Sequence, residues 1–146
     1  MEIFKDHLVI NERKDGLRGL RIIHQKTGKD EYLDFGESTY TSRISTNREF
    51  NTNVLRYSYS SMLTPSSTYD YNMDSGQLTL MKQQEVVGGY DQNNYESERL
   101  YAIARDGELV PISIVYKKDL KKVESQNLLL YAYGSYGSTI DPYFSS

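Results

Sequence analysis

Apolar and polar residues alternate along much of the chain, and this period of two predicts β-strands. Residues 6–13 and 17–25 form two such runs, and the turn Lys14–Asp15–Gly16 separates them. A third, shorter run covers residues 31–35 and follows Thr27–Gly28. Glycine readily adopts the positive φ that tight hairpin turns require. The first 36 residues therefore predict a three-stranded antiparallel meander.

A second group of alternating runs covers residues 54–60, 68–73 and 77–82. Pro65 ends the first of these runs, and Asp74–Ser75–Gly76 provides a turn between the last two. The group predicts a second antiparallel meander, which a polar segment joins to the first. Two successive meanders of three or four strands are typical of the blades of a β-propeller, although these two show no sharp self-similarity.

The character of the sequence changes at residues 84–94, where a double glycine and a cluster of Asp and Asn indicate a connector and a domain boundary. Beyond it, residues 97–105 and 109–116 predict another hairpin. Residues 117–126 mix charges of both signs and predict a solvated loop. The run at 127–133 is apolar without alternation, as is typical of a strand buried on both faces, and it leads into a Gly-rich loop at 134–138.

Composition refines this β-rich prediction. The 146 residues are 38% hydrophobic, and the aromatic residues are 14 Tyr and four Phe without Trp. Once the aromatics are subtracted, about a quarter of the chain remains as aliphatic residues, which is a thin supply for one compact core of this size. Tyrosine must therefore contribute much of the buried surface, and this favours strands over helices.

Charge and cysteine content exclude several classes of protein. A net charge of −3 argues against a surface for nucleic acid or for anionic membranes. The absence of cysteine excludes a disulfide scaffold, a thiolate metal site and a Cys nucleophile. No run of 18 apolar residues could span a bilayer, and residues 1–6 lack the pattern of a secretory signal. We expect a soluble chain in the cytoplasm.

Five stretches carry a resemblance to a known family. They are residues 60–65, 82–86, 95–100, 104–113 and 129–137, the last reading Leu-Leu-Tyr-Ala-Tyr-Gly-Ser-Tyr-Gly. A buried strand that ends in such a Gly-rich loop is where α/β-hydrolases often place oxyanion-hole donors. In these stretches, and in their order, the chain resembles the prolyl oligopeptidase family of serine peptidases, and within it the oligopeptidase B branch.

The resemblance implies a two-domain enzyme with a β-propeller and an α/β-hydrolase catalytic domain. The expected fold is mainly β: residues 1–83 would end the propeller, residues 84–94 would be the connector, and residues 95–146 would supply the first three strands of the hydrolase domain. The implied activity is the hydrolysis of short peptides after Lys or Arg, with no cofactor and no metal. The implied partners are short peptides with basic residues.

One residue of the family's chemistry can be carried over. The second Tyr of the motif, whose hydroxyl donates to the oxyanion of the tetrahedral intermediate, corresponds to Tyr133. A phenol held at a rigid strand end suits this role, because charge develops there in the transition state. Without the resemblance, Tyr133 would be one more strand tyrosine that packs its ring. Ala132 and the pair Ser135–Tyr136 depart from the family's common residues.

The triad that this family needs is missing from the sequence. No Gly-x-Ser-x-Gly occurs, and Gly134–Ser135–Tyr136–Gly137 has the wrong spacing. The two histidines, His7 and His24, fall in predicted propeller strands, where a structural role is more common than a catalytic one. We therefore expect the chain to be an internal fragment of a serine oligopeptidase and to be inactive alone.

Other chemistry is weakly indicated. The carboxylate pairs Asp70 with Asp74 and Glu96 with Glu98 are better interpreted as turn and surface residues. The acidic residues near the N-terminus lack calcium-loop spacing, and nucleotide-binding glycine motifs are absent. The alternative function is a non-enzymatic β-rich interaction module or a remnant of a larger protein.

Overall fold

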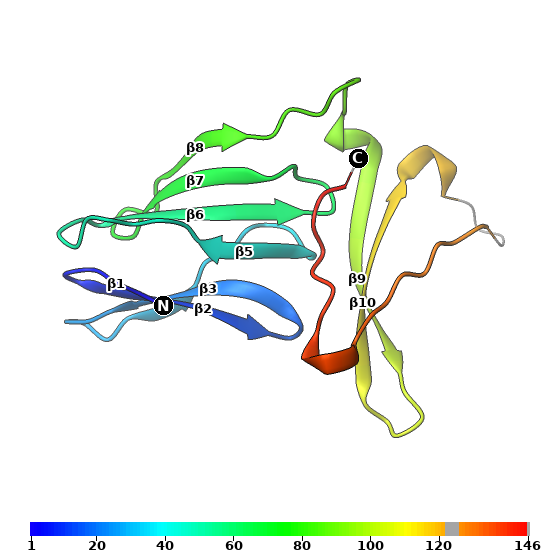
Figure 1. Cartoon of the computed structure of the whole chain (residues 1–146), viewed down its shortest axis with the longest axis horizontal. Coiled ribbons are helices and arrows are strands. Elements are labelled where there is room, and N and C mark those ends of the chain that lie inside the picture. The colour runs from blue at the N-terminus through cyan, green and yellow to red at the C-terminus, as the bar shows by residue number, and fades with distance from the viewer. Residues whose placement is uncertain (122–125, 146) are drawn as a thin grey trace.

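The computed structural model describes residues 1–121 and 126–145. In these two ranges, ten strands form two sheets, together with three 3₁₀ turns (Figure 1). The strands are β1 (Glu2–Ile3), β2 (His7–Lys14), β3 (Leu17–His24), β4 (Asp30–Tyr32), β5 (Tyr40–Ile44), β6 (Val54–Ser61), β7 (Ser67–Asn72), β8 (Leu78–Gln83), β9 (Tyr95–Ile103) and β10 (Leu109–Lys117). The 3₁₀ turns are η1 (Gln92–Asn94), η2 (Lys118–Leu120) and η3 (Ser135–Gly137).

The first eight strands form two four-stranded antiparallel units. Strands β1 to β4 make the first and β5 to β8 the second, and a single parallel residue pair, Arg18 with Thr41, joins them through β3 and β5. Two successive meanders were expected here, and the mainly β prediction is confirmed. Asp15 and Gly16 both have positive φ, 50° and 80°, which is the geometry of a type I′ hairpin turn.

Strand β5 lies in the segment that the sequence predicts only as a polar joint. Its central Ser42 is buried, and the hydroxyl donates to the carbonyl of Arg18 at 3.0 Å. The Asn11 amide donates to the carbonyls of Gly19 and Ser42 at 2.9 and 3.0 Å. These bonds satisfy buried polar groups, so a strand without apolar alternation can still lie inside the sheet.

The core of this eight-stranded sheet is rich in aromatic rings. Its buried residues are Phe4, Val9, Leu20, Ile22, Leu55, Tyr57, Tyr59 and Met73. The Tyr59 ring stacks on Phe35 with centroids 4.9 Å apart, and Tyr57 stacks on Tyr69 at 5.7 Å. Burial raises the pKa of Tyr57 and Tyr59 well above the usual value. Tyrosine therefore supplies core surface in this part of the chain, whereas Tyr133 and Tyr136 are exposed.

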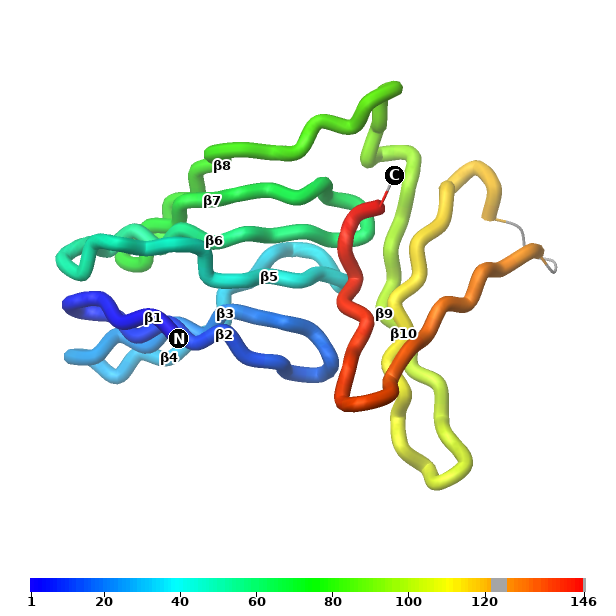
Figure 2. The backbone as a smooth tube through the Cα atoms, viewed as in Figure 1, coloured from blue at the N-terminus to red at the C-terminus, as the bar shows by residue number. Residues whose placement is uncertain are grey.

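Strands β9 and β10 form a separate hairpin that lies across one end of the eight-stranded sheet (Figures 1 and 2). Arg99 of β9 connects the two: its guanidinium donates to the Asp15 carbonyl at 2.9 Å and to the Ser113 hydroxyl at 2.7 Å. A Cβ on Gly16 would lie 2.6 Å from the Arg99 Nη2 atom. Glycine is therefore favoured at this turn for its positive φ, and a side chain here would require the flexible end of Arg99 to move.

The predicted buried strand at residues 127–133 is wrong for this structure. The chain there is irregular, and Leu128, Leu129 and Leu130 are 71, 90 and 75% exposed. A strand buried on both faces needs paired neighbours and covering layers, and β9 and β10 pair only with each other among the described residues. The predicted loop at 117–126 is partly β10 and η2, and its residues 122–125 lie outside the described residues.

Candidate functional site

The Gly-rich loop that contains Tyr133 forms a tight turn. Residues Ser135–Gly137 make η3, which the backbone closes with a hydrogen bond from the Ser138 amide to the Ser135 carbonyl at 3.0 Å. Tyr136 and Gly137 both have positive φ, 55° and 70°. The Tyr133 side chain is half exposed, and its hydroxyl has no hydrogen-bond partner among the described residues. The phenol of Tyr133, just before this turn, is therefore open to a ligand.

The segment after the turn is anchored on strands of the eight-stranded sheet. Asp141, with a side chain only 13% exposed, pairs with Arg13 at 2.7 Å and with Arg18 at 3.0 Å. These arginines lie on β2 and β3, so the ion pairs join residues more than 120 positions apart. No local sequence pattern links charges at such a separation, so the sequence did not indicate these three residues.

A second anchor in the same segment is Phe144. The Phe144 amide donates to the Ser60 hydroxyl at 3.0 Å, and its ring packs edge-on against Tyr90 at 4.9 Å. The Tyr90 hydroxyl in turn donates to the carbonyl of Leu63 at 2.7 Å. Figures 1 and 2 show this terminal segment passing between the sheet and the β9–β10 hairpin. The carboxyl side of the Tyr133 loop is therefore fixed by contacts to the eight-stranded sheet and to Tyr90.

A half-buried carboxylate, Glu37, organises the connection between β6 and β7. It accepts hydrogen bonds from the hydroxyls of Tyr59 at 3.0 Å, Ser61 at 2.5 Å and Thr64 at 2.6 Å. The Ser61 hydroxyl also accepts from the Thr64 amide at 2.7 Å. Residues 60–65, one of the stretches that carry the family resemblance, are thus a turn held by a carboxylate that sequence reasoning did not identify.

The paired carboxylates do not act together. Asp70 binds Arg56 with two bonds of 2.7 Å, and this partner lowers the pKa of Asp70. Glu98 accepts from the Tyr116 hydroxyl and from Lys121, and these donors lower its pKa. Asp70 and Glu98 are thus each occupied by a local partner, whereas Asp74 contacts His7 of the first four-stranded unit.

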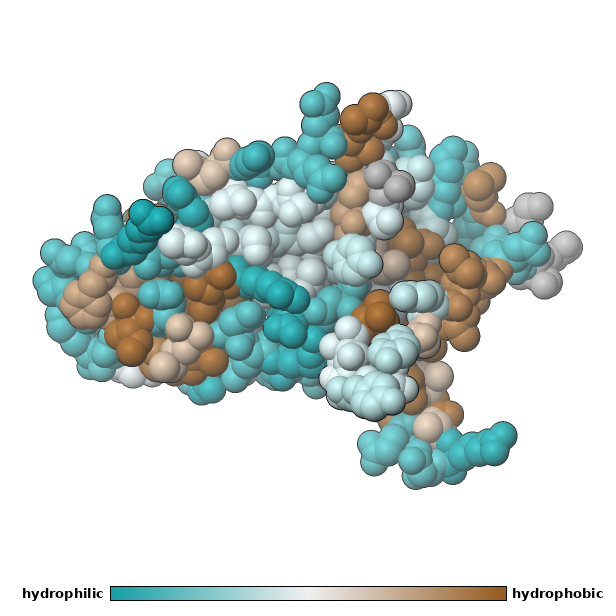
Figure 3. Space-filling model, viewed as in Figure 1, coloured by the Kyte–Doolittle hydropathy of each residue, from teal (hydrophilic) through white to brown (hydrophobic). Residues whose placement is uncertain are grey.

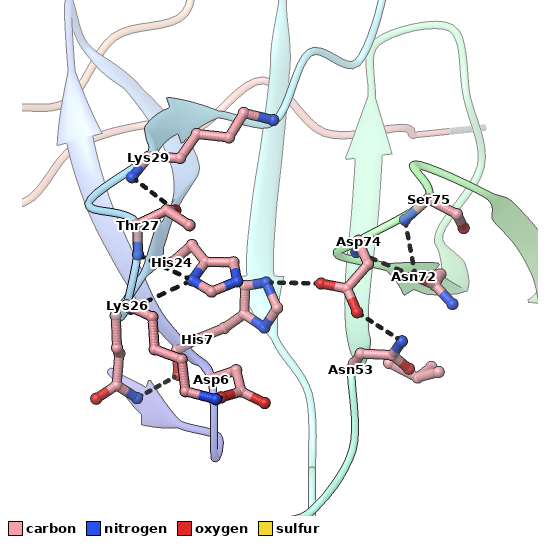
Figure 4. Close-up of polar contacts among 12 residues, drawn as sticks. Asp6, His7, His24, Lys26, Thr27, Lys29, Asn53, Asn72, Asp74 and Ser75 are labelled. Carbon is pink, nitrogen blue, oxygen red and sulfur yellow. Dashed lines mark hydrogen bonds and ion pairs between the residues drawn. The ribbon is translucent and has the colours of Figure 1, made fainter.

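The structure brings both histidines together with Asp74. His7 is buried, its ring lies 4.8 Å from that of His24, and its Nε2 atom lies 3.3 Å from Asp74 (Figure 4). One potential ligand atom from each of the three residues lies within 4.8 Å of the others, so this cluster could hold a metal ion. The sequence expectation placed the histidines on strands, which is correct, but it foresaw no cluster.

Similarity to known proteins covers nearly the whole chain. The dipeptidyl aminopeptidase BI of Pseudoxanthomonas mexicana is 43% identical over 99% of the chain, and Protease 2 of Moraxella lacunata is 33% identical over 97%. The solved structure of oligopeptidase B from Trypanosoma brucei with covalently bound antipain superposes with a TM-score of 0.83 at 33% identity, over 99% of this chain and 21% of that one.

The chain spans about a fifth of the length of these relatives, 20% of each of the two curated sequences. No helix among the described residues is long and apolar enough to cross a membrane.

The family model for the N-terminal β-propeller domain of prolyl oligopeptidase matches residues 1–84, which include both four-stranded units. The chain therefore belongs to the prolyl oligopeptidase family.

Proposed function

We propose that this chain is a segment of a serine peptidase that hydrolyses short peptides after Lys or Arg in the cytoplasm. The observation that carries the proposal is the similarity to proteins named as peptidases along 97 to 99% of the chain. The oligopeptidase B resemblance implies the preference for cleaving the peptide bond after a basic residue.

We assign residues 1–83 to the end of the propeller, 84–94 to the connector and 95–146 to the start of an α/β-hydrolase domain. The break between the eight-stranded sheet, which ends at Gln83, and the hairpin that begins at Tyr95 supports this division. Residues 127–133 would become the third hydrolase strand only when neighbouring strands and covering helices are present.

Tyr133 would donate its hydroxyl to the oxyanion of the tetrahedral intermediate. Its open hydroxyl and the anchored turn beside it support this role. Such a donor works when it is held in place before the reaction, because then no free energy is spent on reorienting it. In the chain alone, the segment before Tyr133 is irregular and exposed. Lacking the triad and a rigid donor, the chain alone would be inactive.

A second candidate activity is the release of dipeptides from peptide N-termini. The 43% identity to a protein named dipeptidyl aminopeptidase favours it. The non-enzymatic β-rich module stays the alternative to both activities.

The decisive experiment places residues 1–146 into Protease 2 of Moraxella lacunata, in exchange for the segment that matches them. We expect the chimera to cleave a fluorogenic peptide with Arg before the scissile bond, and the 146-residue chain alone to release no fluorophore. In the chimera, Tyr133→Phe should lower kcat by about 10²–10³ with a small change in KM.

Tyr131→Phe is the matched control, because Tyr131 lies in the same apolar segment and is also exposed. It should leave kcat within about twofold. An unchanged kcat in Tyr133→Phe would refute the oxyanion role, and labelling of the isolated chain by a serine-directed phosphonate would refute its inactivity. Preference of the chimera for unblocked dipeptide substrates would select the aminopeptidase alternative.

A further inference from the structure

The cluster of His7, His24 and Asp74 joins the two four-stranded units of the propeller. His7 and His24 are directly paired across β2 and β3, which places their side chains on the same face of the first unit. Asp74 lies in the turn between β7 and β8, in the second unit. Figure 4 shows the Asp74 carboxylate pointing at the His7 ring from this turn. Three side chains from two sheet units thus converge on one point.

Each side chain of the cluster is held by further contacts. The His24 Nδ1 atom accepts from the amides of Lys26 and Thr27 at 3.3 and 3.4 Å, which leaves Nε2 as the free ring atom. The Asn53 amide donates to one oxygen of Asp74 at 2.9 Å, and the other oxygen faces His7. Outer contacts of this kind orient metal ligands in proteins.

The spacing within the cluster suits an ion better than a direct hydrogen bond. The distance of 3.3 Å from His7 Nε2 to Asp74 Oδ1 exceeds the usual length of an N–H···O bond. Two ligands about 2.0–2.1 Å from a tetrahedral Zn²⁺ lie roughly 3.3 Å apart, so this pair already has the separation that zinc requires. The three ligand atoms spread over up to 4.8 Å, so a bound ion requires them to move closer together.

The surroundings are also compatible with a cation. The cluster borders a cavity of about 120 Å³, which is enough for an ion and a water molecule. Lys29 also lines this cavity, but Glu31 pairs with its ammonium group at 2.8 Å and offsets its charge.

We propose that His7, His24 and Asp74 bind one Zn²⁺ ion, with water as the fourth ligand. Two imidazoles and one carboxylate favour a transition metal over Ca²⁺ or Mg²⁺, which prefer oxygen ligands. The ion would link the first unit to the second at a place away from the β3–β5 seam, where the pair Arg18 with Thr41 and the side-chain bonds of Asn11 and Ser42 join them. Its role is therefore structural, and the proposal is independent of the peptidase function.

The test is calorimetric titration of the 146-residue chain, stripped of metal, with ZnCl₂. We expect one bound ion per chain and a melting temperature raised by roughly 5–10 °C at a hundredfold excess over Kd. His24→Gln and Asp74→Asn should each weaken binding at least about tenfold. Asp106→Asn is the control, because this exposed acid lies in the distant β9–β10 turn and should leave Kd unchanged.

X-ray absorption of the zinc-loaded wild-type chain provides a readout that needs no variant to fold. Two imidazole ligands in the zinc shell would support the site, and a shell without imidazole would overturn it. Binding that is absent at millimolar zinc, or that stays equally tight in folded His24→Gln and Asp74→Asn, would also overturn it.

Discussion

Single residues determine how this mainly β chain buries polar groups. Glu37 accepts hydrogen bonds from three hydroxyls, those of Tyr59, Ser61 and Thr64, and all three donor residues are buried. A buried hydroxyl that loses its acceptor retains the full cost of desolvation, whereas a satisfied one contributes modestly. The Glu37 carboxylate therefore contributes more to the free energy of unfolding than its partial exposure suggests.

We predict that Glu37→Ala lowers the free energy of unfolding by about 2–4 kcal/mol, because it leaves three donors without their acceptor. Glu37→Gln retains one oxygen acceptor and should lose less. Urea unfolding followed by circular dichroism measures both. Glu108→Ala, at an exposed turn position, is the control and should stay within about 0.5 kcal/mol of the parent. A loss this small in Glu37→Ala would contradict the assigned role.

At the scale of elements, the β2–β3 turn contacts the β9–β10 hairpin at a glycine. Arg99 reaches the Asp15 carbonyl, and the absence of a side chain on Gly16 makes room for its guanidinium. The turn therefore reverses the chain between β2 and β3, and it also contacts the second sheet.

We predict that Gly16→Ala destabilises the chain more than Gly107→Ala. Both glycines have positive φ, 80° and 90°, so both variants carry strain of about 1–2 kcal/mol. Only at Gly16 would the new methyl group also displace the Arg99 guanidinium from the Asp15 carbonyl, since the space around Gly107 is open. Urea unfolding of each variant gives the difference.

The same comparison in an Arg99→Ala background isolates the docking contact. Removal of the guanidinium should abolish the excess loss at Gly16 while leaving the strain common to both glycines. Equal losses at the two positions in the parent chain would show that the close approach has no energetic consequence.

At the scale of the whole molecule, the apolar surface is unevenly distributed. Figure 3 shows apolar side chains gathered around the β9–β10 hairpin and the segment that follows it. Leu128, Leu129, Leu130 and Tyr131 are consecutive and all at least 71% exposed. Contiguous apolar surface of this kind is uncommon on a monomer and favours association.

We predict that the 146-residue chain self-associates through this segment and binds a hydrophobic dye. The double variant Leu129→Lys/Leu130→Lys should lower dye fluorescence several-fold and move the mass from light scattering toward 16.9 kDa. Val87→Lys is the matched control, because Val87 is 95% exposed but lies outside the segment. A monomeric parent chain with no dye binding would contradict the prediction.

Most strands of both sheets were predictable from the sequence. The run expected at residues 54–60 is β6, Val54–Ser61, and the run expected at 109–116 is β10, Leu109–Lys117. Alternation and turn glycines act within a few residues, so the local sequence suffices to specify such strands and their hairpins. The Gly-rich loop and its Tyr133 were also visible as a motif.

Only the tertiary structure decided the features that depend on distant partners. The polar segment Tyr40–Ile44 became a strand because it pairs with β6 and because Asn11 and Arg18 bond to its buried Ser42. Residues 127–133 did not, because nothing described covers them. The ion pairs of Asp141 and the cluster of His7, His24 and Asp74 likewise join positions far apart in the chain. Burial and pairing are properties of the assembled sheets, and a periodic pattern along the sequence does not contain them.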